Sequence, residues 1–224
     1  MVSHSLPAAA PTAGQHTDDL MPRRALRVVH PASGVDLDAA EQAAAAFLRA
    51  LGISLDSESL AATPGRMARA YAEMFSPRPF DLTTFPNDAR YDELIVARSI
   101  PVQSICEHHL LPFVGVAHVG YLPGDRILGL SKLARVVEMF ARRPQVQERL
   151  TQQVADWLQD QVAPRGVGVV VEAEHQCMTV RGVGATGTTT VTSALHGQLR
   201  GDAASRAEFF ALIAANQQPG VRHG

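Results

Sequence analysis

Apolar residues spaced three and four positions apart predict helices in the N-terminal part of the chain. One such pattern covers residues 36–51, and a second covers residues 63–74. Thr63 can cap the second helix, and Pro64 suits its first helical position because a proline needs no N–H partner there. We therefore expect an N-terminal helical segment within residues 33–92.

Valine-rich and aromatic segments predict β-strands in the rest of the chain. Four strands are expected at residues 94–105, 113–121, 166–173 and 188–195. Three further helices are expected at residues 131–142, from Pro144 onward, and at residues 203–215. This order predicts an α+β fold in which a four-stranded antiparallel sheet carries helices packed on one face. The two open edges of such a sheet favour association with further copies of the chain.

Composition and charge limit the class of function. The chain has 224 residues, 46% hydrophobic and 19% charged, which suits one folded domain rather than two. Its formal net charge of −2 argues against a general nucleic-acid-binding protein. No stretch reaches the roughly 20 apolar residues that a membrane helix needs, and the N-terminus lacks the pattern of a secretory signal. We therefore predict a cytoplasmic protein whose partners include neither nucleic acid nor membrane.

Domain boundaries follow from the same patterns. Residues 1–32 are rich in Ala, Pro, Ser and Thr without periodicity, and they predict a flexible N-terminal tail. The folded domain is expected over residues 33–216, with the sheet and its helices at residues 93–216 as its core. Residues 217–224 are expected to form a C-terminal tail.

The densest group of chemically reactive side chains is CEHH at residues 106–109, followed far downstream by HQC at residues 175–177. In a secreted protein the two cysteines could form a disulfide, but in a reducing compartment they are better explained as thiolate metal ligands. A catalytic zinc keeps three protein ligands and one open position. Cys106, His109 and Cys177 would leave that position open, although iron(II) could also occupy a Cys₂His site.

Two histidines, His108 and His175, remain beside these three residues. Imidazoles near a catalytic metal suit general acid–base catalysis at neutral pH. Two thiolates and a neutral imidazole cancel the charge of zinc, so a zinc-bound water would be less acidic than one bound beside three histidines. A neighbouring base that takes the proton of this water would therefore be useful. A structural zinc would need neither spare histidine. A further histidine, His118, lies on a predicted strand and is expected to be structural.

A basic helix start is the second chemical feature of the chain. Ser131 is predicted as the N-cap of the helix at residues 131–142, with Lys132 and Arg135 near its first turn. Free backbone N–H groups, the helix dipole and these two cations predict an anion site of phosphate size. On this segment alone, an exposed helix face with incidental charges stays open as the alternative.

The start of the next helix carries Glu148. A carboxylate near a first helical turn is favoured by the helix dipole and needs no ligand to explain it. A carboxylate can also accept two hydrogen bonds from the N–H edge of a guanine. The spacing does not separate these two explanations.

Several segments together resemble the GTP cyclohydrolase I family. They are SICEHHLLPFVGVAHVGYLP (104–123), GLSKLARVVEMFARRPQVQERLT (129–151), VVVEAEHQCMTVRGV (169–183), TPGRMARAYAEMF (63–75) and TVTSALHGQLRGDAASRAEFFALI (190–213). The resemblance covers roughly residues 36–215 and includes both halves of the metal motif.

The resemblance implies the tunnelling fold (T-fold), in which antiparallel four-stranded sheets join edge to edge into a ring. Two rings then stack into a homodecamer with active sites at subunit interfaces. It also implies the zinc-dependent hydrolysis of GTP to 7,8-dihydroneopterin triphosphate and formate, the first step of tetrahydrofolate and pterin biosynthesis. Water adds to C8 of the purine, the imidazole ring opens, formate leaves, and the ribose rearranges before the pterin ring closes.

The same resemblance implies a role for each residue at a matching position. The expected zinc ligands are Cys106, His109 and Cys177. The expected catalytic residues are His108 and His175 for proton transfer, Ser131 for the later rearrangement, and Glu107 for orienting an imidazole. The expected substrate contacts are Glu148 with Gln147 at the guanine, Lys132, Arg135 and Arg181 at the triphosphate, Arg66 from a neighbouring subunit, and Leu130.

Two alternatives stay open beside this family. One is another tunnelling-fold enzyme acting on a pterin or deazaguanine, although the three-histidine zinc pattern of pyruvoyl-tetrahydropterin synthases is absent. The other is a non-catalytic nucleotide-binding module with a structural zinc, against which the two spare histidines argue. The loop GATGTT at residues 184–189 departs from the family, which commonly has basic residues there.

Overall fold

A computed structural model describes residues 27–28 and 34–215 of the chain. The predicted tails, apart from Arg27–Val28, lie outside the described residues. The helices are α1 (Leu37–Ala50), α2 (Glu58–Ala61), α3 (Thr63–Met74), α4 (Leu130–Ala141), α5 (Gln147–Val162), α6 (Gln176–Thr179), α7 (Gly197–Gly201) and α8 (Ala203–Ala214). The strands are β1 (Arg27–Val28), β2 (Phe80–Asp81), β3 (Thr84–Pro86), β4 (Ile95–Cys106), β5 (Pro112–Leu122), β6 (Arg126–Leu128), β7 (Pro144–Gln145), β8 (Gly166–His175) and β9 (Thr189–His196). Within this described part, no helix is long and apolar enough to cross a membrane.

The central sheet has five strands in the order β7-β4-β5-β8-β9, whereas four were predicted. The four long strands are those expected from the sequence, and they pair antiparallel. The fifth strand, β7, pairs in parallel with the end of β4 through Ile105 with Pro144 and Cys106 with Gln145. The helix predicted from Pro144 starts only at Gln147, because the two residues of β7 are extended along the sheet edge.

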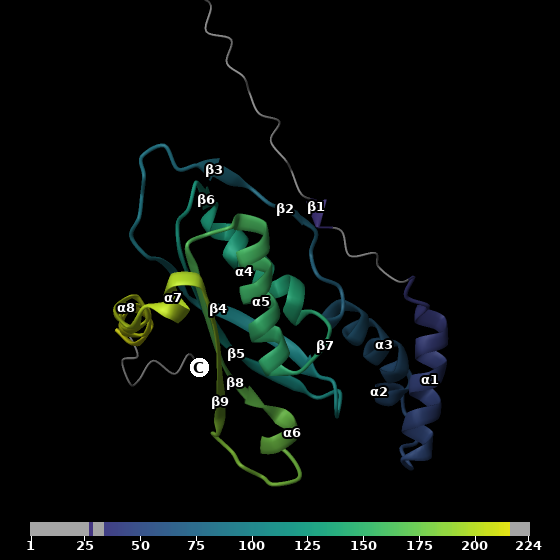
Figure 1. Cartoon of the computed structure of the whole chain (residues 1–224). Coiled ribbons are helices and arrows are strands. Elements are labelled where there is room, and N and C mark those ends of the chain that lie inside the picture. The colour runs from purple at the N-terminus through teal and green to yellow at the C-terminus, as the bar shows by residue number, and fades with distance from the viewer. Residues whose placement is uncertain (1–26, 29–33, 216–224) are drawn as a thin grey trace, which may run out of the picture.

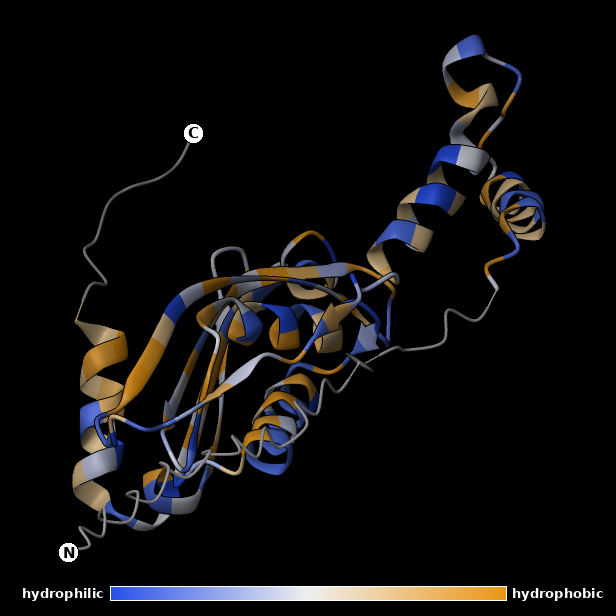
Figure 2. Ribbon diagram, turned by 90° about the horizontal axis from the view of Figure 1, so that it is seen from above, coloured by the Kyte–Doolittle hydropathy of each residue, from blue (hydrophilic) through white to orange (hydrophobic). Residues whose placement is uncertain are grey.

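Helices α4 and α5 cover one face of this sheet (Figure 1). Their buried apolar residues occur at the predicted helical spacing, and they pack against alternate residues of the strands. Main-core residues include Leu133, Val136 and Val137 of α4, Leu150, Val154 and Leu158 of α5, and Val167, Val169 and Val171 of β8. Figure 2 shows the resulting amphipathic pattern, with hydrophobic and hydrophilic residues alternating around the helices beside the sheet.

The opposite face of the sheet is also covered, by helix α8, so helices do not pack on one face only as predicted. Phe209 of α8 is fully buried against Gly120 of β5 and Gly168 of β8, which pair with each other across the two strands. A Cβ atom on Gly168 would come within 2.8 Å of the Phe209 ring. The two facing glycines therefore create the space for this helix, and helical periodicity does not reveal such a space.

Helices α1 and α3 pack against each other and lie to one side of the sheet (Figure 1). Asp36 caps α1 by accepting a backbone N–H bond of 2.9 Å, as its position before the helix favours. Thr63, predicted as a cap, is instead the first residue of α3, and Ala62 occupies the cap position without a side-chain bond. Within α1, Ala44 is buried whereas Phe47 is 54% exposed, so a single chain covers only part of the apolar stripe.

Candidate active site

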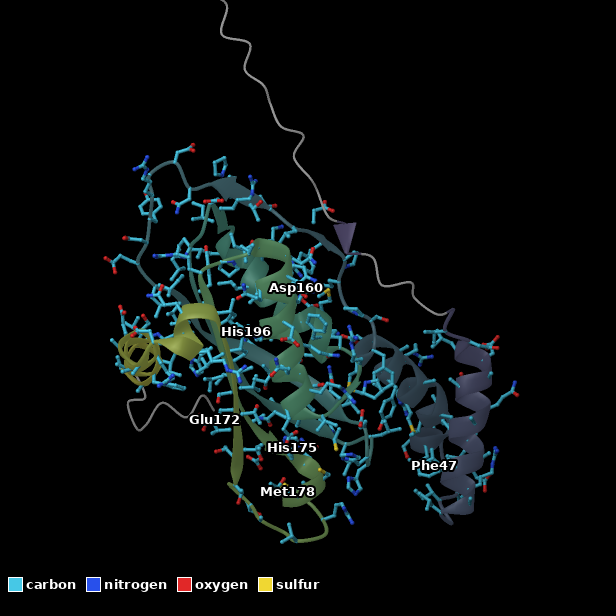
Figure 3. All side chains as sticks on the ribbon, viewed as in Figure 1. Phe47, Asp160, Glu172, His175, Met178 and His196 are labelled. Atoms are coloured by element: carbon cyan, nitrogen blue, oxygen red, sulfur yellow. The ribbon has the colours of Figure 1, made fainter. Side chains whose placement is uncertain are left out.

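Two strands of the sheet bring the two halves of the metal motif together. β4 and β8 run in the same direction on either side of β5, because each pairs antiparallel with it. Cys106 is the last residue of β4, and His175 is the last residue of β8. The short helix α6 follows directly and carries Cys177. Figure 3 shows His175 at this end of the sheet, with Met178 of α6 close by.

Cys106, His109 and Cys177 can hold one metal ion, because their ligand atoms all lie within 4.8 Å of one another. Cys106 is buried, Cys177 is partly buried and His109 is exposed. Burial raises the pKa of the Cys177 thiol, and the neighbouring Cys106 thiol raises it further, since one thiolate disfavours a second beside it. A divalent cation would remove this conflict, so the two sulfur donors and one nitrogen donor fit zinc.

A tight turn after Cys106 positions the adjacent histidines. The Leu110 N–H donates to the Cys106 carbonyl at 2.8 Å, and Leu110 adopts a left-handed φ of 51°. The Leu110 carbonyl accepts a hydrogen bond from the Tyr71 hydroxyl at 3.0 Å, so helix α3 stabilises this turn. His108 Nδ1 lies 3.8 Å from Cys106 Sγ, and the His108 side chain is 63% exposed. His108 is therefore beside the metal site and open to solvent.

Glu107 is held by Arg149, a residue that the sequence did not indicate. The two side chains form an ion pair, and the Arg149 hydrogen bond lowers the pKa of Glu107. Arg149 Nε also donates to Oε1 of the fully buried Gln145 at 2.9 Å, and the Gln145 carbonyl accepts the Glu107 N–H at 3.0 Å. Glu107 Oε1 lies 3.9 Å from His108 Nε2. The network of Arg149, Gln145 and Glu107 therefore connects α5 to the turn that carries His108.

His175 is held on two sides. Its ring stacks on Phe113 with centroids 4.6 Å apart and planes 12° apart, because the two residues lie opposite each other in β8 and β5. His175 Nε2 lies 2.7 Å from Gln147 Oε1. Burial lowers the pKa of His175, and the Glu148 carboxylate acts in the opposite direction. An imidazole with a lowered pKa is neutral at neutral pH and can accept a proton.

Two further predicted substrate contacts lie at the same end of the sheet. Glu148 is exposed in the first turn of α5, close enough to His175 to affect its pKa. Arg181 follows α6, is exposed, and donates to the Cys177 carbonyl at 3.4 Å. An acidic and a basic side chain thus flank the metal site.

The predicted basic helix start lies far from the metal site within one chain. Gly129 is the N-cap of α4, and Ser131, predicted as the cap, lies inside the helix. The other end of α4 reaches the metal region, where the Ala141 carbonyl accepts the Ser104 hydroxyl of β4 at 2.6 Å. The helix has 12 residues and spans about 18 Å, so its basic start is roughly one helix length from Cys106.

The cations predicted for the anion site have partners of their own. Arg135 pairs with Glu138 at 3.3 Å, and Arg78 donates two hydrogen bonds of 2.7 and 2.8 Å to the same carboxylate. The Lys132 ammonium lies 6.0 Å from the centre of the Phe80 ring. Arg78 was not predicted, because it contacts Glu138 from a segment outside the recognised motifs.

The other residues singled out in the sequence have the following surroundings. Leu130 is 66% exposed, and Arg66 donates to the Ser59 carbonyl at 2.7 Å within the N-terminal helices. His118 is 6% exposed inside the sheet, which agrees with its expected structural role. His196, for which the sequence indicated no partner, lies 2.7 Å from an Asp156 carboxylate oxygen.

The fold and the site together define a class: a mixed α+β protein in which two cysteines and one histidine can hold a metal ion at one end of a mainly antiparallel sheet. Comparison with known proteins adds the family. Residues 40–214 match the family described as GTP cyclohydrolase I, and the chain belongs to this family.

Close relatives support this assignment over most of the chain. The GTP cyclohydrolase 1 of Mycobacteroides abscessus is 54% identical over 190 residues, which cover 82% of this chain and 93% of the relative. That of Streptomyces avermitilis is 55% identical over 181 residues, covering 79% and 90%. Among solved structures, an archaeosine synthase QueF-Like in the apo form has a TM-score of 0.38 and 19% identity, covering 46% of this chain and 93% of its own.

Proposed function

We propose that this chain is a GTP cyclohydrolase I, which uses water to open the imidazole ring of GTP and releases formate and 7,8-dihydroneopterin triphosphate. The observation that carries the proposal is the grouping of Cys106, His109 and Cys177 within 4.8 Å, with His108 and His175 beside them. Family membership and relatives at 54% and 55% identity make GTP the expected substrate.

Zinc is the metal that we propose for this site. When bound, it would supply a Lewis acid that makes water a better nucleophile toward C8 of the guanine. Cys106 and Cys177 would bind it as thiolates, and His109 through one ring nitrogen. Two sulfurs and one nitrogen favour zinc over magnesium or calcium, which prefer oxygen ligands.

Two imidazoles would move the protons of the reaction. His175 is neutral at neutral pH because burial lowers its pKa, so it would accept a proton and later return it to a ring nitrogen. His108 is 63% exposed and would exchange protons at the solvent side of the site. Glu107, held by Arg149, would orient His108 from its distance of 3.9 Å.

Glu148 would recognise the guanine edge, with Gln147 beside it. The exposed carboxylate of Glu148 can accept two N–H bonds, which fits the amidine edge of a guanine. Arg181, beside Cys177, would contact the triphosphate of the same substrate.

We further propose that a complete site needs more than one chain. Ser131 lies about 15 Å, and Arg135 about 9 Å, along α4 from Ala141 at the metal end of their own chain, with Lys132 between them, and Leu130 and Arg66 are exposed. T-fold sheets joined edge to edge, in a cytoplasmic homodecamer of two stacked rings, would bring these residues to the metal end of another chain. The later rearrangement, in which Ser131 would assist, then takes place at a subunit interface.

A fluorescence assay tests the proposed function. Zinc-loaded protein is incubated with GTP, the product is oxidised, and neopterin fluorescence is recorded together with released formate. We expect both products in equal amounts. If the zinc-loaded wild-type protein binds GTP but gives neither product, the non-catalytic nucleotide-binding module becomes the better explanation.

A further inference from the structure

Gln147 is a buried amide that contacts His175. Only 1% of its surface is exposed. Its Nε2 donates to the Val171 carbonyl at 3.0 Å and to the Thr190 carbonyl at 2.9 Å, and lies 3.2 Å from Thr192 Oγ1. Its Oε1 lies 2.7 Å from His175 Nε2. Both ends of the amide are therefore engaged by the protein.

The two backbone carbonyls determine which way the amide points. A carbonyl oxygen accepts hydrogen bonds and cannot donate them. If the Gln147 amide were turned over, its oxygen would face the carbonyls of Val171 and Thr190 at about 3 Å with no hydrogen between them, and a buried group would lose both bonds. The NH₂ group must face the carbonyls, so the amide oxygen faces His175.

The neighbouring hydroxyls agree with this orientation. Thr151 Oγ1 donates its hydrogen to the Gln147 backbone carbonyl at 2.8 Å. The 2.6 Å contact between Thr151 and Thr192 therefore requires Thr192 to be the donor. The Thr192 oxygen can then share one of the two Nε2 hydrogens of Gln147, at the longer distance of 3.2 Å. The hydroxyls are therefore compatible with the orientation that the two backbone carbonyls require.

We propose that Gln147 is a positioning residue that keeps a hydrogen on Nε2 of the His175 ring, so that Nδ1 is the nitrogen through which the ring exchanges a proton. This inference rests on the proposed function, in which His175 takes part in proton transfer. An amide oxygen only accepts, so it binds Nε2 only when that nitrogen carries a hydrogen. Stacking on Phe113 holds the ring plane at the same time. Both the plane and the tautomer of His175 are thereby set before the substrate arrives.

The assignment changes the role of Gln147 from that expected by resemblance. Its amide hydrogens point to protein acceptors, so its side chain has none left to donate to a guanine. Of the two neighbouring residues, Glu148 is then the one whose side chain recognises the base. Gln147 acts on the reaction through His175.

The tautomer can be measured directly in the wild-type, zinc-loaded protein. Long-range ¹H–¹⁵N spectra of ¹⁵N-histidine-labelled protein distinguish a ring protonated on Nε2 from one protonated on Nδ1, and the spectrum of His175→Gln identifies the His175 signals. We expect the Nε2–H form. An Nδ1–H or averaged ring would overturn the proposal. This result does not depend on turnover of GTP, so it is separate from the test of the proposed function.

A pair of glutamine variants then tests the effect on catalysis. Gln147→Met keeps the size of the side chain and removes both hydrogen-bonding groups. We expect the His175 signals to become a mixture of tautomers and kcat to fall about 10- to 100-fold, while KM for GTP stays within about twofold. Gln159→Met makes the same change near the other end of α5, where Gln159 donates to the Pro164 carbonyl at 3.3 Å, and should leave the spectrum and kcat unchanged.

The outcomes of this pair are distinct. A folded Gln147→Met protein with wild-type kcat, or with an unchanged His175 spectrum, would overturn the proposal. If Gln147→Met does not fold, as judged by its melting curve, the wild-type spectrum alone decides.

Discussion

The two ends of helix α4 lie in contrasting surroundings. At its C-terminal end, buried polar groups surround the metal residues, with Gln145 and Gln147 only 0% and 1% exposed. At its N-terminal end, Leu130 is 66% exposed and Ser131 is also exposed. One chain therefore groups the metal residues from its own segments, whereas Leu130 and Ser131 at the other end face solvent. This contrast is the one expected under the proposed assembly, in which one chain supplies the metal residues of a site and another supplies its anion-binding residues.

Charge is unevenly distributed along α4. In its second half, Glu138 is shared by Arg78, Arg135 and Arg142, so three cations meet one carboxylate. Lys132 adds a further positive charge nearer the helix start. This excess positive charge suits a ligand with several negative charges, such as a triphosphate.

The largest expected effect comes from breaking the metal end. Cys177→Ser removes a thiolate, and a neutral hydroxyl is a poor zinc ligand. We expect zinc content near zero and activity at the background of the neopterin assay, whereas the neighbouring Met178→Leu retains both. Full activity of Cys177→Ser without bound metal would show that this end is not a metal centre.

A smaller loss is expected when proton transfer alone is removed. His108→Ala should keep its zinc, because His109 and the two cysteines remain, and should lose activity by about 10²–10⁴-fold. Metal analysis and the neopterin assay give the two readouts. His196→Ala, in which the histidine paired with Asp156 is removed, serves as the control with activity unchanged. If His108→Ala loses zinc together with activity, the division between a binding and a proton-transferring histidine is wrong.

A mixing experiment tests whether the two ends act in different chains. His175→Ala and Lys132→Ala, each expected to be inactive alone, are unfolded together in equal amounts and allowed to reassemble. If each site combines the metal end of one chain with the basic end of another, random mixing restores about one quarter of the sites. The neopterin assay measures the recovery. No recovery from well-assembled mixed oligomers would place both functions in the same chain.

The smallest effect concerns the contribution of the Glu138 ion pairs to stability. Burial raises the pKa of Glu138, but Arg78 and its other arginine partners outweigh this and hold it below the usual value. A carboxyl group with a lowered pKa in the folded state stabilises the protein at neutral pH, and this contribution is lost as the pH falls through that lowered value. Glu138→Gln should therefore lower the melting temperature by a few degrees at neutral pH and by less in acid.

The control for this measurement is Glu208→Gln, which changes an exposed carboxylate of α8. Its melting curve should match that of the wild type at each pH. If Glu138→Gln lowers the melting temperature by the same amount at neutral and at acid pH, the result argues against the ion-pair explanation.

Hydrophobic periodicity predicted the long elements well, because it reports directly which face is buried. The segment predicted at residues 131–142 corresponds to α4, and the strand predicted at residues 166–173 corresponds to β8. Elements held by distant contacts were missed or displaced. Pro144 suggested a helix start but lies in β7, since pairing with the end of β4 keeps it extended. The residues around Phe209 have helical periodicity, but this periodicity does not show which face of the sheet the helix covers.

The amino-acid sequence by itself determined the chemistry available to this protein. Cys106, His109 and Cys177 have the donor atoms of a zinc site whatever the fold, because ligand preference is a property of each side chain. Only the tertiary structure decided how these groups are supported. The order β4, β5, β8 in the sheet sets Phe113 against His175, and α5 sets Gln147 against the same ring. Distances, orientations and burial between residues far apart in the chain depend on strand order and register, and spacing in the sequence does not contain them.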